Sequence, residues 1–209
     1  MKLLIIGASR GVGLELVRQA LDARHEVTAL LRNPSTFELS HEKLTVLKGH
    51  ILDKASIEKA VVGRDVVCLT IGIKVTRKPV SVFSKGAEAV IEAMNDSACK
   101  RLITVTGIGA GDSKGHGGFL YDKIFTPLFV KTIYEDKNRQ EAIVRQSGLD
   151  WTIVRPGFLT DGPLTGKYRA LTDLSGVKAG KISRADVAHF ILREAADPKY
   201  VRQTPLLTY

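Results

Sequence analysis

The sequence contains little that would support a secreted, membrane-spanning or metal-dependent protein. Its 209 residues include only two cysteines, Cys68 in an apolar stretch and Cys99 in a polar turn, which is typical of free thiols in a reducing compartment. No apolar run approaches the roughly 18 residues that a membrane helix needs, and nothing before the first apolar segment resembles a cleavable leader. No cluster of His, Cys and carboxylates has metal-ligand spacing. We therefore expect a cytoplasmic protein with no membrane partner and no metal.

The charge balance is uneven. The chain has 31 Lys and Arg against 22 Asp and Glu, a formal charge of +9, which favours an anionic partner such as a phosphorylated cofactor, an acidic substrate or a polyanion. The basic residues are spread along the chain, and we find no nucleic-acid motif and no basic run interleaved with aromatics. We therefore expect a small-molecule partner and no nucleic acid. The length and the hydrophobic content of 44% suit one globular α/β domain.

The amino-terminal segment combines an apolar strand with a glycine-rich turn. Residues Lys2–Ile6 run into Gly7, Gly11 and Gly13, and an amphipathic helix follows. Such glycines allow a sharp turn and the close approach of a pyrophosphate to the helix N-terminus. A strand, a turn, a helix and a second strand form the context that this motif requires. We predict a dinucleotide site that includes Gly7, Ala8, Ser9, Arg10, Gly11, Val12 and Gly13.

The end of the second predicted strand indicates which dinucleotide binds. The strand Glu26–Leu31 is followed by Arg32 and not by Asp or Glu. NAD enzymes usually place a carboxylate here, roughly 20 residues past the glycines, to hold the ribose 2′-hydroxyl. The guanidinium of Arg32, with that of Arg10, would instead bind a 2′-phosphate through charge-assisted hydrogen bonds. We predict an NADP(H) site; a merely solvated role for Arg32 is the alternative.

Apolar strands and amphipathic helices alternate along the chain. This alternation predicts a Rossmann-type, doubly wound parallel sheet in a single α/β domain over residues 1–209. The predicted strands are 2–6, 26–31, 44–48, 65–71, 101–106, 150–155 and 168–172. The predicted helices begin at Val12, cover 54–62 and 79–95, run from the cap Thr126 and Pro127 to Gln146, and follow a capping box at Ser183–Asp186.

Ligands of open parallel sheets bind beyond the carboxyl ends of the strands. A substrate cleft is therefore expected from the loops after strands four, five and six. The glycine-rich segment Gly107–Gly118 is longer than a routine connection and is expected to form a lid or substrate loop. Further cofactor contacts are expected at Gly72, Ile73, Thr106, Gly107, Pro156, Gly157, Phe158 and Leu159. Substrate contacts are expected at the basic Lys74 and Arg77, for which a solvated turn is an equal alternative, and at the aromatic Phe119 and Tyr121.

Five stretches resemble the small, atypical short-chain dehydrogenases/reductases, in particular the biliverdin reductase B and flavin reductase group and its NmrA-like relatives. They are residues 7–13, 31–33, 147–156, 161–168 and 182–188, which occur in the family's order. The resemblance implies NADPH-dependent reduction of flavins or linear tetrapyrroles, with FMN as a candidate substrate and little acid–base chemistry by the protein. It also implies cofactor contacts at His50, Ile51, Ile71 and Lys137.

The chain departs from the wider superfamily at the Tyr-x-x-x-Lys motif, whose tyrosine donates a proton and whose lysine binds the nicotinamide ribose. Tyr134 precedes Lys137 by three residues and not by four, so Ile133 stands in the tyrosine's place. Thr106 ends strand five where a catalytic serine often lies. The candidate catalytic residues are thus Thr106, Lys137 and Tyr134, although Tyr134 could be a packing residue and Lys137 could form a helix pair with Glu141.

Reduction of a planar, anionic small molecule by NADPH is the preferred hypothesis. A sugar epimerase or carbonyl reductase is an alternative, disfavoured by the incomplete tyrosine–lysine motif and by the lack of a sizeable C-terminal substrate domain. A non-enzymatic NADP(H)-binding sensor or assembly protein is the other, suggested by the weak catalytic constellation. We expect a monomer or a small homo-oligomer.

Overall fold

A central sheet organises the molecule. The computed structural model describes residues 1–119 and 121–209, and within them eight strands form this sheet in the order β3-β2-β1-β4-β5-β6-β10-β8. All neighbours are parallel except β10 and β8, which pair antiparallel. The strands are β1 (Lys2–Ile6), β2 (Glu26–Leu31), β3 (Leu44–Lys48), β4 (Val66–Leu69), β5 (Arg101–Val105), β6 (Asp150–Pro156), β8 (Arg169–Leu171) and β10 (Leu206–Thr208).

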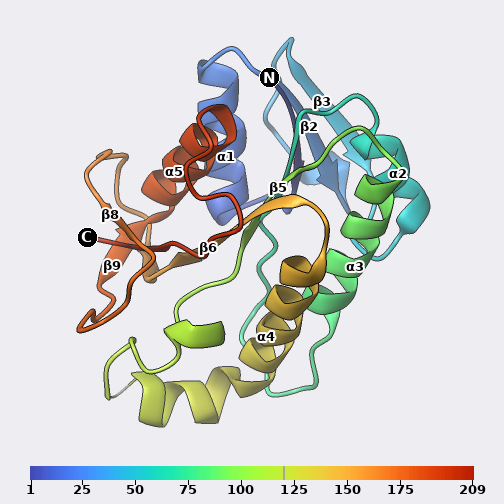
Figure 1. Ribbon diagram of the computed structural model, residues 1–209. Helices are drawn as coiled ribbons and strands as arrows, with labels where there is room; N and C mark the ends of the chain where they lie inside the picture. The colour runs from blue at the N-terminus through green and yellow to red at the C-terminus, as the bar shows by residue number, and fades with distance from the viewer. Residues whose placement is uncertain (120) are drawn as a thin grey trace.

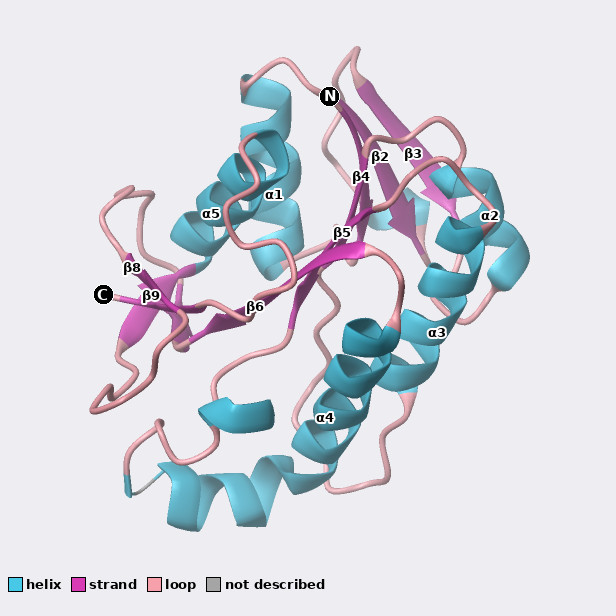
Figure 2. Ribbon diagram, in the orientation of Figure 1, coloured by secondary structure: helices cyan, strands magenta, loops and turns pink. Residues whose placement is uncertain are grey.

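Helices cover both faces of the sheet (Figures 1 and 2). On one face α1 (Gly11–Asp22) packs against α5 (Arg184–Ala196); on the other α3 (Val82–Asn95) lies between α2 (Lys54–Val61) and α4 (Lys131–Gln146). Each face has its own apolar core, and alternate residues of β1 contribute to one or the other: Leu3 and Ile5 to the α1–α5 side, Leu4 and Ile6 to the α2–α4 side. Strands buried on both faces are mostly apolar, which is why the sequence shows them as nearly continuous apolar runs.

The predicted doubly wound α/β fold is confirmed, and so are the bounds of β1, β2 and β3. The sheet differs from the prediction at one edge, where β8 runs antiparallel. Three short strands were not predicted, namely β10, β7 (Phe158–Thr160) and β9 (Lys181–Ser183), of which the last two form a small parallel pair. Each has three residues, too few for a periodic pattern to show.

The prediction that a helix begins at Thr126 and Pro127 is wrong. Both residues lie inside a π-helix over Tyr121–Val130, and the regular helix α4 starts only at Lys131. Proline lacks the backbone N–H that an α-helical turn requires, and wide π turns are a known departure from the α-helical hydrogen-bond pattern.

The segment Gly107–Gly118 contains a 3-10 turn at Gly111–Ser113, and another such turn lies at Pro34–Thr36. In the described part of the chain no helix has the length and apolar character to cross a membrane.

A buried carboxylate sets the relative position of α3 and α4 beside the sheet. Asp136 of α4 is fully buried and accepts hydrogen bonds from the backbone N–H of Phe83 at 2.8 Å and from the Ser84 hydroxyl at 2.5 Å. An acidic group at the first turn of a helix satisfies unpaired N–H groups and interacts favourably with the helix dipole. The start of α3 is thereby fixed to the middle of α4, which carries Lys137.

Candidate functional site

A cavity of about 560 Å³ opens at the carboxyl ends of the central strands. Its wall combines the turn after β1 with the ends of β2, β4, β5 and β6. This position is the ligand-binding edge of an open parallel sheet, and the volume lies in the range of small-molecule and cofactor sites.

The glycine turn between β1 and α1 is packed tightly against β4. Gly7 has a φ of +94°, and a Cβ atom there would come within 2.8 Å of the carbonyl carbon of Thr70. A Cβ at Gly13 would meet the Thr70 hydroxyl at 2.6 Å. Gly11 is less confined, because the nearest atoms to a Cβ there belong to the Arg184 side chain at the ordinary contact distance of 3.7 Å. The turn thus leaves the N-terminus of α1 open to the cavity, as the close approach of a pyrophosphate requires.

Cations dominate the charged part of the wall. Among the described residues that line the cavity, Arg10, Arg32, Lys137 and Arg184 are cationic and Asp161 is the single carboxylate. Arg10 donates a hydrogen bond to the carbonyl of Gly72 at 3.2 Å, and Arg32 is exposed directly after β2. The part of the cavity at the ends of β1 and β2 therefore presents guanidinium groups where NAD enzymes place an acid.

Lys137 and Thr106 meet at the other end of the cavity. The amino group of Lys137 donates a hydrogen bond to the backbone carbonyl of Thr106. The Thr106 hydroxyl donates in turn to the carboxylate of Glu141 at 2.7 Å. Burial lowers the pKa of Lys137 to about 8, and the negative charge of Glu141 opposes this shift only in part. An amine of this kind can be either protonated or neutral close to neutral pH, which is the property of an amine that takes part in proton transfer.

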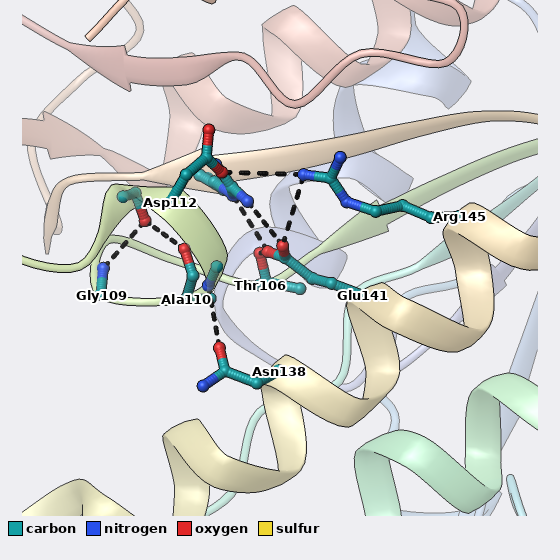
Figure 3. A network of polar contacts seen from close by, with 10 residues as sticks. Thr106, Gly109, Ala110, Asp112, Asn138, Glu141 and Arg145 are labelled. Atoms are coloured by element: carbon teal, nitrogen blue, oxygen red, sulfur yellow. Dashed lines mark hydrogen bonds and ion pairs between the residues drawn. The ribbon is translucent and has the colours of Figure 1, made fainter. Parts of the chain in front are cut away.

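A buried ion network supports this end of the cavity from behind. Arg155 of β6 donates to the Glu141 carboxylate through Nε at 3.0 Å and Nη2 at 2.6 Å, and the two side chains are only 0% and 3% exposed. Arg155 also pairs with Asp112. Figure 3 shows Asp112 and Glu141 both facing Arg145, at 3.7 and 4.0 Å. Burial alone would raise the pKa of Asp112, but these guanidinium groups bring it below its usual value.

This network ties the segment Gly107–Gly118 to β6 and α4. Asp112 supplies one anchor, and the backbone N–H of Gly111 supplies another by donating to Asn138 at 2.8 Å. The first half of the segment is thus held by ionic contacts beside Thr106.

Tyr134 is not among the residues that line the cavity, and its hydroxyl is bonded to another tyrosine. This hydroxyl is 2.7 Å from the hydroxyl of Tyr121, and a Cβ at Gly107 would lie 3.4 Å from it. Burial raises the pKa of Tyr134 far above its ordinary value, and the neighbouring Tyr121 adds to the shift. A phenol that is this hard to ionise, and that already shares its hydrogen bond with another phenol, is a poor proton donor.

The structure brings most of the predicted cofactor residues to the cavity. Those that line it are Gly7, Ser9, Arg10, Gly11, Val12, Arg32, His50, Ile51, Ile71, Gly72, Ile73, Thr106, Lys137, Pro156 and Leu159. The remaining predicted cofactor residues lie just outside the lining: Ala8, Gly13, Gly107, Gly157 and Phe158. Ala8, for example, is fully buried in the apolar core.

The predicted substrate residues lie outside the cavity lining. Lys74 is exposed, while Arg77 donates to the Leu128 carbonyl at 3.0 Å and lies over the Phe129 ring at 5.2 Å. Phe119 is 74% exposed, and Tyr121 packs edge-on against Phe158.

Several lining residues were not predicted. They are Ile6, Leu30, Leu31, Gly49, Thr70, Val82, Val105, Asp161 and Arg184. Most belong to strand ends next to predicted positions, so a wider window at each strand end would have found them. Asp161 and Arg184 lie in the stretches 161–168 and 182–188, whose resemblance to the family was the available signal.

The fold, the glycine turn and this cavity define a Rossmann-type dinucleotide-binding protein. Residues 7–198 match the NAD(P)H-binding family. The chain therefore belongs to the NAD(P)H-binding family.

Relatives and solved structures cover nearly the whole chain. An uncharacterized sugar epimerase of Bacillus subtilis, YhfK, is 31% identical over 92% of this chain and 86% of its own. The structure of ChuY, an anaerobillin reductase from Escherichia coli O157:H7, has 25% identity and a TM-score of 0.83 and covers 100% of this chain and 97% of its own. A short-chain dehydrogenase/reductase from Veillonella parvula, solved in complex with NADP, shares the fold with a TM-score of 0.84 at 18% identity, over 100% of this chain and 94% of its own.

Proposed function

We propose that this protein is an NADPH-dependent reductase of planar, anionic acceptors, either a flavin such as FMN or a linear tetrapyrrole. The observation that carries the proposal is the distribution of charge along the cavity. Guanidinium groups lie at the adenosine end, and an amine with a lowered pKa lies at the other end. A bound NADPH supplies a hydride at that second end, and the protein holds the partners in contact.

The preference for NADPH over NADH follows from Arg32 and Arg10. A 2′-phosphate is a dianion that guanidinium groups bind through forked hydrogen bonds. A carboxylate at the end of β2 would repel it, and in this chain Arg32 stands there. Arg10, already held at the Gly72 carbonyl, is positioned to contribute a second cation.

Lys137 holds the ribose at the nicotinamide end in this proposal, as the resemblance implies. The Thr106 carbonyl directs its amino group, and Glu141 engages the Thr106 hydroxyl so that this hydroxyl cannot donate into the cavity. The hydroxyl of Tyr134 is bonded to that of Tyr121. The proton that accompanies reduction would then come from Lys137 or from solvent, which suits a flavin or a tetrapyrrole better than a simple alcohol or ketone.

A row of four aromatic side chains outside the cavity, here called the aromatic ladder, offers a stacking surface for such an acceptor. Its members are Phe158, Tyr121, Phe125 and Phe129. Phe158 contacts Tyr121 edge-on with centroids 4.9 Å apart, Tyr121 stacks on Phe125 at 5.7 Å, and Phe125 lies 5.4 Å from Phe129. Arg77 lies over the last ring. Phe125 and Phe129 are 42% and 39% exposed, so the ladder leads from the edge of the cavity to the surface. The similarity to the anaerobillin reductase ChuY supports an acceptor of this class.

Steady-state oxidation of NADPH against FMN, riboflavin, biliverdin and quinones tests the proposal, with NADH as the control cofactor. We expect NADPH to be consumed with at least one flavin or tetrapyrrole, and NADH to be used poorly. Absence of turnover with every acceptor would contradict a reductase. Tight binding of NADP(H) without turnover would then favour the sensor or assembly protein.

A sugar epimerase is the second candidate, because the relative YhfK carries that description. An epimerase needs a group that takes a proton from the sugar and returns it. Tyr134 does not line the cavity and its hydroxyl is bonded to that of Tyr121, which argues against this role. Activity on a nucleotide sugar that is lost in Tyr134→Phe would establish it instead.

A further inference from the structure

Arg184 reaches the glycine turn from the opposite end of the sequence. It is the first residue of α5, directly after Ser183, whose hydroxyl caps the helix by accepting from the Asp186 N–H at 2.9 Å. Its Cδ and Nε atoms lie 3.7 Å from the place of a Gly11 Cβ, and the side chain lines the cavity. Arg184 therefore covers the point at which α1 opens to the cavity.

Asp161 is the partner of Arg184. Its carboxylate lies 2.6 Å from Nη1 of Arg184, but the Asp161 side chain is 90% exposed. An ion pair whose acid is surrounded by water contributes little net free energy, so a dianionic ligand can replace it readily. The guanidinium would then exchange one oxygen acceptor for others without leaving the cavity.

The surroundings of Arg184 keep it in place during such an exchange. Asp186, in the first turn of α5, accepts from the backbone N–H groups of Thr165 and Gly166 at 2.9 and 2.8 Å and from the Tyr209 hydroxyl at 2.7 Å. These bonds fasten the segment after Asp161 to the start of α5. The helix end and the segment that carries Asp161 thus form one supported unit next to the glycine turn.

We infer that Arg184 is a pyrophosphate-binding residue, which exchanges the carboxylate of Asp161 for the pyrophosphate of the dinucleotide. The inference rests on the proposed NADP(H)-dependent function. Arg32 and Arg184 are assigned different roles because they lie at different places in the cavity. Arg32 follows β2, where the adenosine ribose of a Rossmann dinucleotide lies, whereas Arg184 lies over Gly11, where the pyrophosphate lies. Arg184 should therefore contribute equally to the binding of NADPH and of NADH, whereas Arg32 should contribute only to the binding of NADPH.

Calorimetric titration of the full chain with NADPH, NADH and adenosine 2′-monophosphate tests this assignment. Arg184→Met should lower the affinities for NADPH and NADH by the same factor. The expected factor is about tenfold or more, the usual loss for a hydrogen bond to a charged group. Adenosine 2′-monophosphate, which has no pyrophosphate, should bind as it does to the wild type. Arg32→Met should lower the affinities for NADPH and adenosine 2′-monophosphate but not the affinity for NADH.

Asp161→Asn tests the exchange itself. Removing the competing carboxylate should raise the affinity for both dinucleotides about two- to fivefold, as expected for a surface ion pair. Weaker or unchanged binding in Asp161→Asn would overturn the exchange.

Arg18→Met is the matched control, because Arg18 lies on α1 and pairs with Glu15 at 2.9 Å but does not line the cavity. It should leave all three affinities unchanged. Should Arg184→Met unfold, Arg184→Lys keeps the charge, loses the forked geometry and should still weaken both dinucleotides in parallel.

Unchanged dinucleotide affinity in the Arg184 variants would overturn the assignment, and so would a loss confined to NADPH and adenosine 2′-monophosphate. These outcomes are separable from a failure of the proposed function. A wild-type protein that binds both dinucleotides but reduces no acceptor would contradict the reductase, while the ratio of the two losses would still decide the role of Arg184.

Discussion

Replacing the lysine at the inner end of the cavity should make the fold more stable. Lys137 holds its amino group against the Thr106 carbonyl, with the rings of Phe83 and Tyr134 at 5.3 and 5.7 Å. These neighbours give the cation little of the solvation that water provides, and burial lowers its pKa from 10.5 to about 8. Lys137→Met retains the aliphatic volume and removes the charge.

The magnitude follows from the two pKa values. A pKa unit is worth about 1.36 kcal/mol, so a decrease from 10.5 to about 8 corresponds to about 3 kcal/mol by which the folded state disfavours the charged amine. The variant also loses the hydrogen bond to Thr106, worth about 1 kcal/mol. We therefore expect Lys137→Met to raise the free energy of unfolding by about 2 kcal/mol at pH 7.

The pH dependence has a definite sign. Below the folded pKa of about 8 the lysine is charged in both states, and the wild type carries the full penalty. Between that value and the unfolded pKa of 10.5 the unfolded chain binds more protons than the folded one, so the wild type gains stability as the pH rises. The advantage of the variant should shrink over this interval and be lost near its upper end.

Urea unfolding of the wild type and of Lys137→Met at several pH values between 7 and 10.5 measures the difference directly. Other groups titrate in this range, but they are common to both proteins and cancel in the difference. A difference that stays constant with pH, or a variant that is less stable at pH 7, would refute the claim that desolvation disfavours the charged form of Lys137 in the folded protein.

Four further variants test the rest of the site. Arg32→Ala should weaken NADPH binding by about 1.5–3 kcal/mol and leave NADH binding unchanged in calorimetric titration; equal losses would show that Arg32 does not bind the 2′-phosphate. Glu141→Gln removes the buried anion of Arg155 and leaves only the exposed Asp112 as its partner, so it should lower the free energy of unfolding by about 3–5 kcal/mol in urea denaturation. The double variant Glu141→Leu with Arg155→Met should recover most of that loss, and a single-variant loss below about 1 kcal/mol would contradict the buried pair. Tyr134→Phe should change kcat with a flavin acceptor by less than about threefold, whereas a loss of about 100-fold or more with intact NADPH affinity would make Tyr134 the proton donor.

The parts of the fold that could be predicted are those in which burial forces a long pattern. The strands β1, β2 and β4–β6 are buried on both sides and appear as apolar runs, and α1 and α3 carry apolar stripes toward the sheet. The three-residue strands at the far edge have no such pattern, because their pairing is decided by distant segments. The antiparallel pairing of β8 with β10, for example, depends on residues 206–208 returning to residues 169–171.

The cavity lining could be predicted where a backbone requirement or a strand end marks it, as at Gly7, Gly11 and Arg32. It could not be predicted where a side chain's partner comes from elsewhere in the chain. Glu141 was expected to be at most a helix partner of Lys137, yet its carboxylate binds Arg155 and the hydroxyl of Thr106. A spacing of four residues indicates which side chains share a helix face, but tertiary contacts decide which of them bind.

Lys137 and the Arg155–Glu141 pair show two different uses of buried charge at one end of the cavity. The ion pair is satisfied on both sides and holds the segment Gly107–Gly118 and α4 against β6, so removing one partner should destabilise the fold. Lys137 faces the cavity with a lowered pKa, so its removal should stabilise the fold. A residue whose loss makes the protein more stable contributes something other than stability, and such residues are concentrated at functional sites. If Lys137→Met proves both more stable and unable to support reduction, Lys137 serves the activity of the protein, whereas the Arg155–Glu141 pair serves its stability.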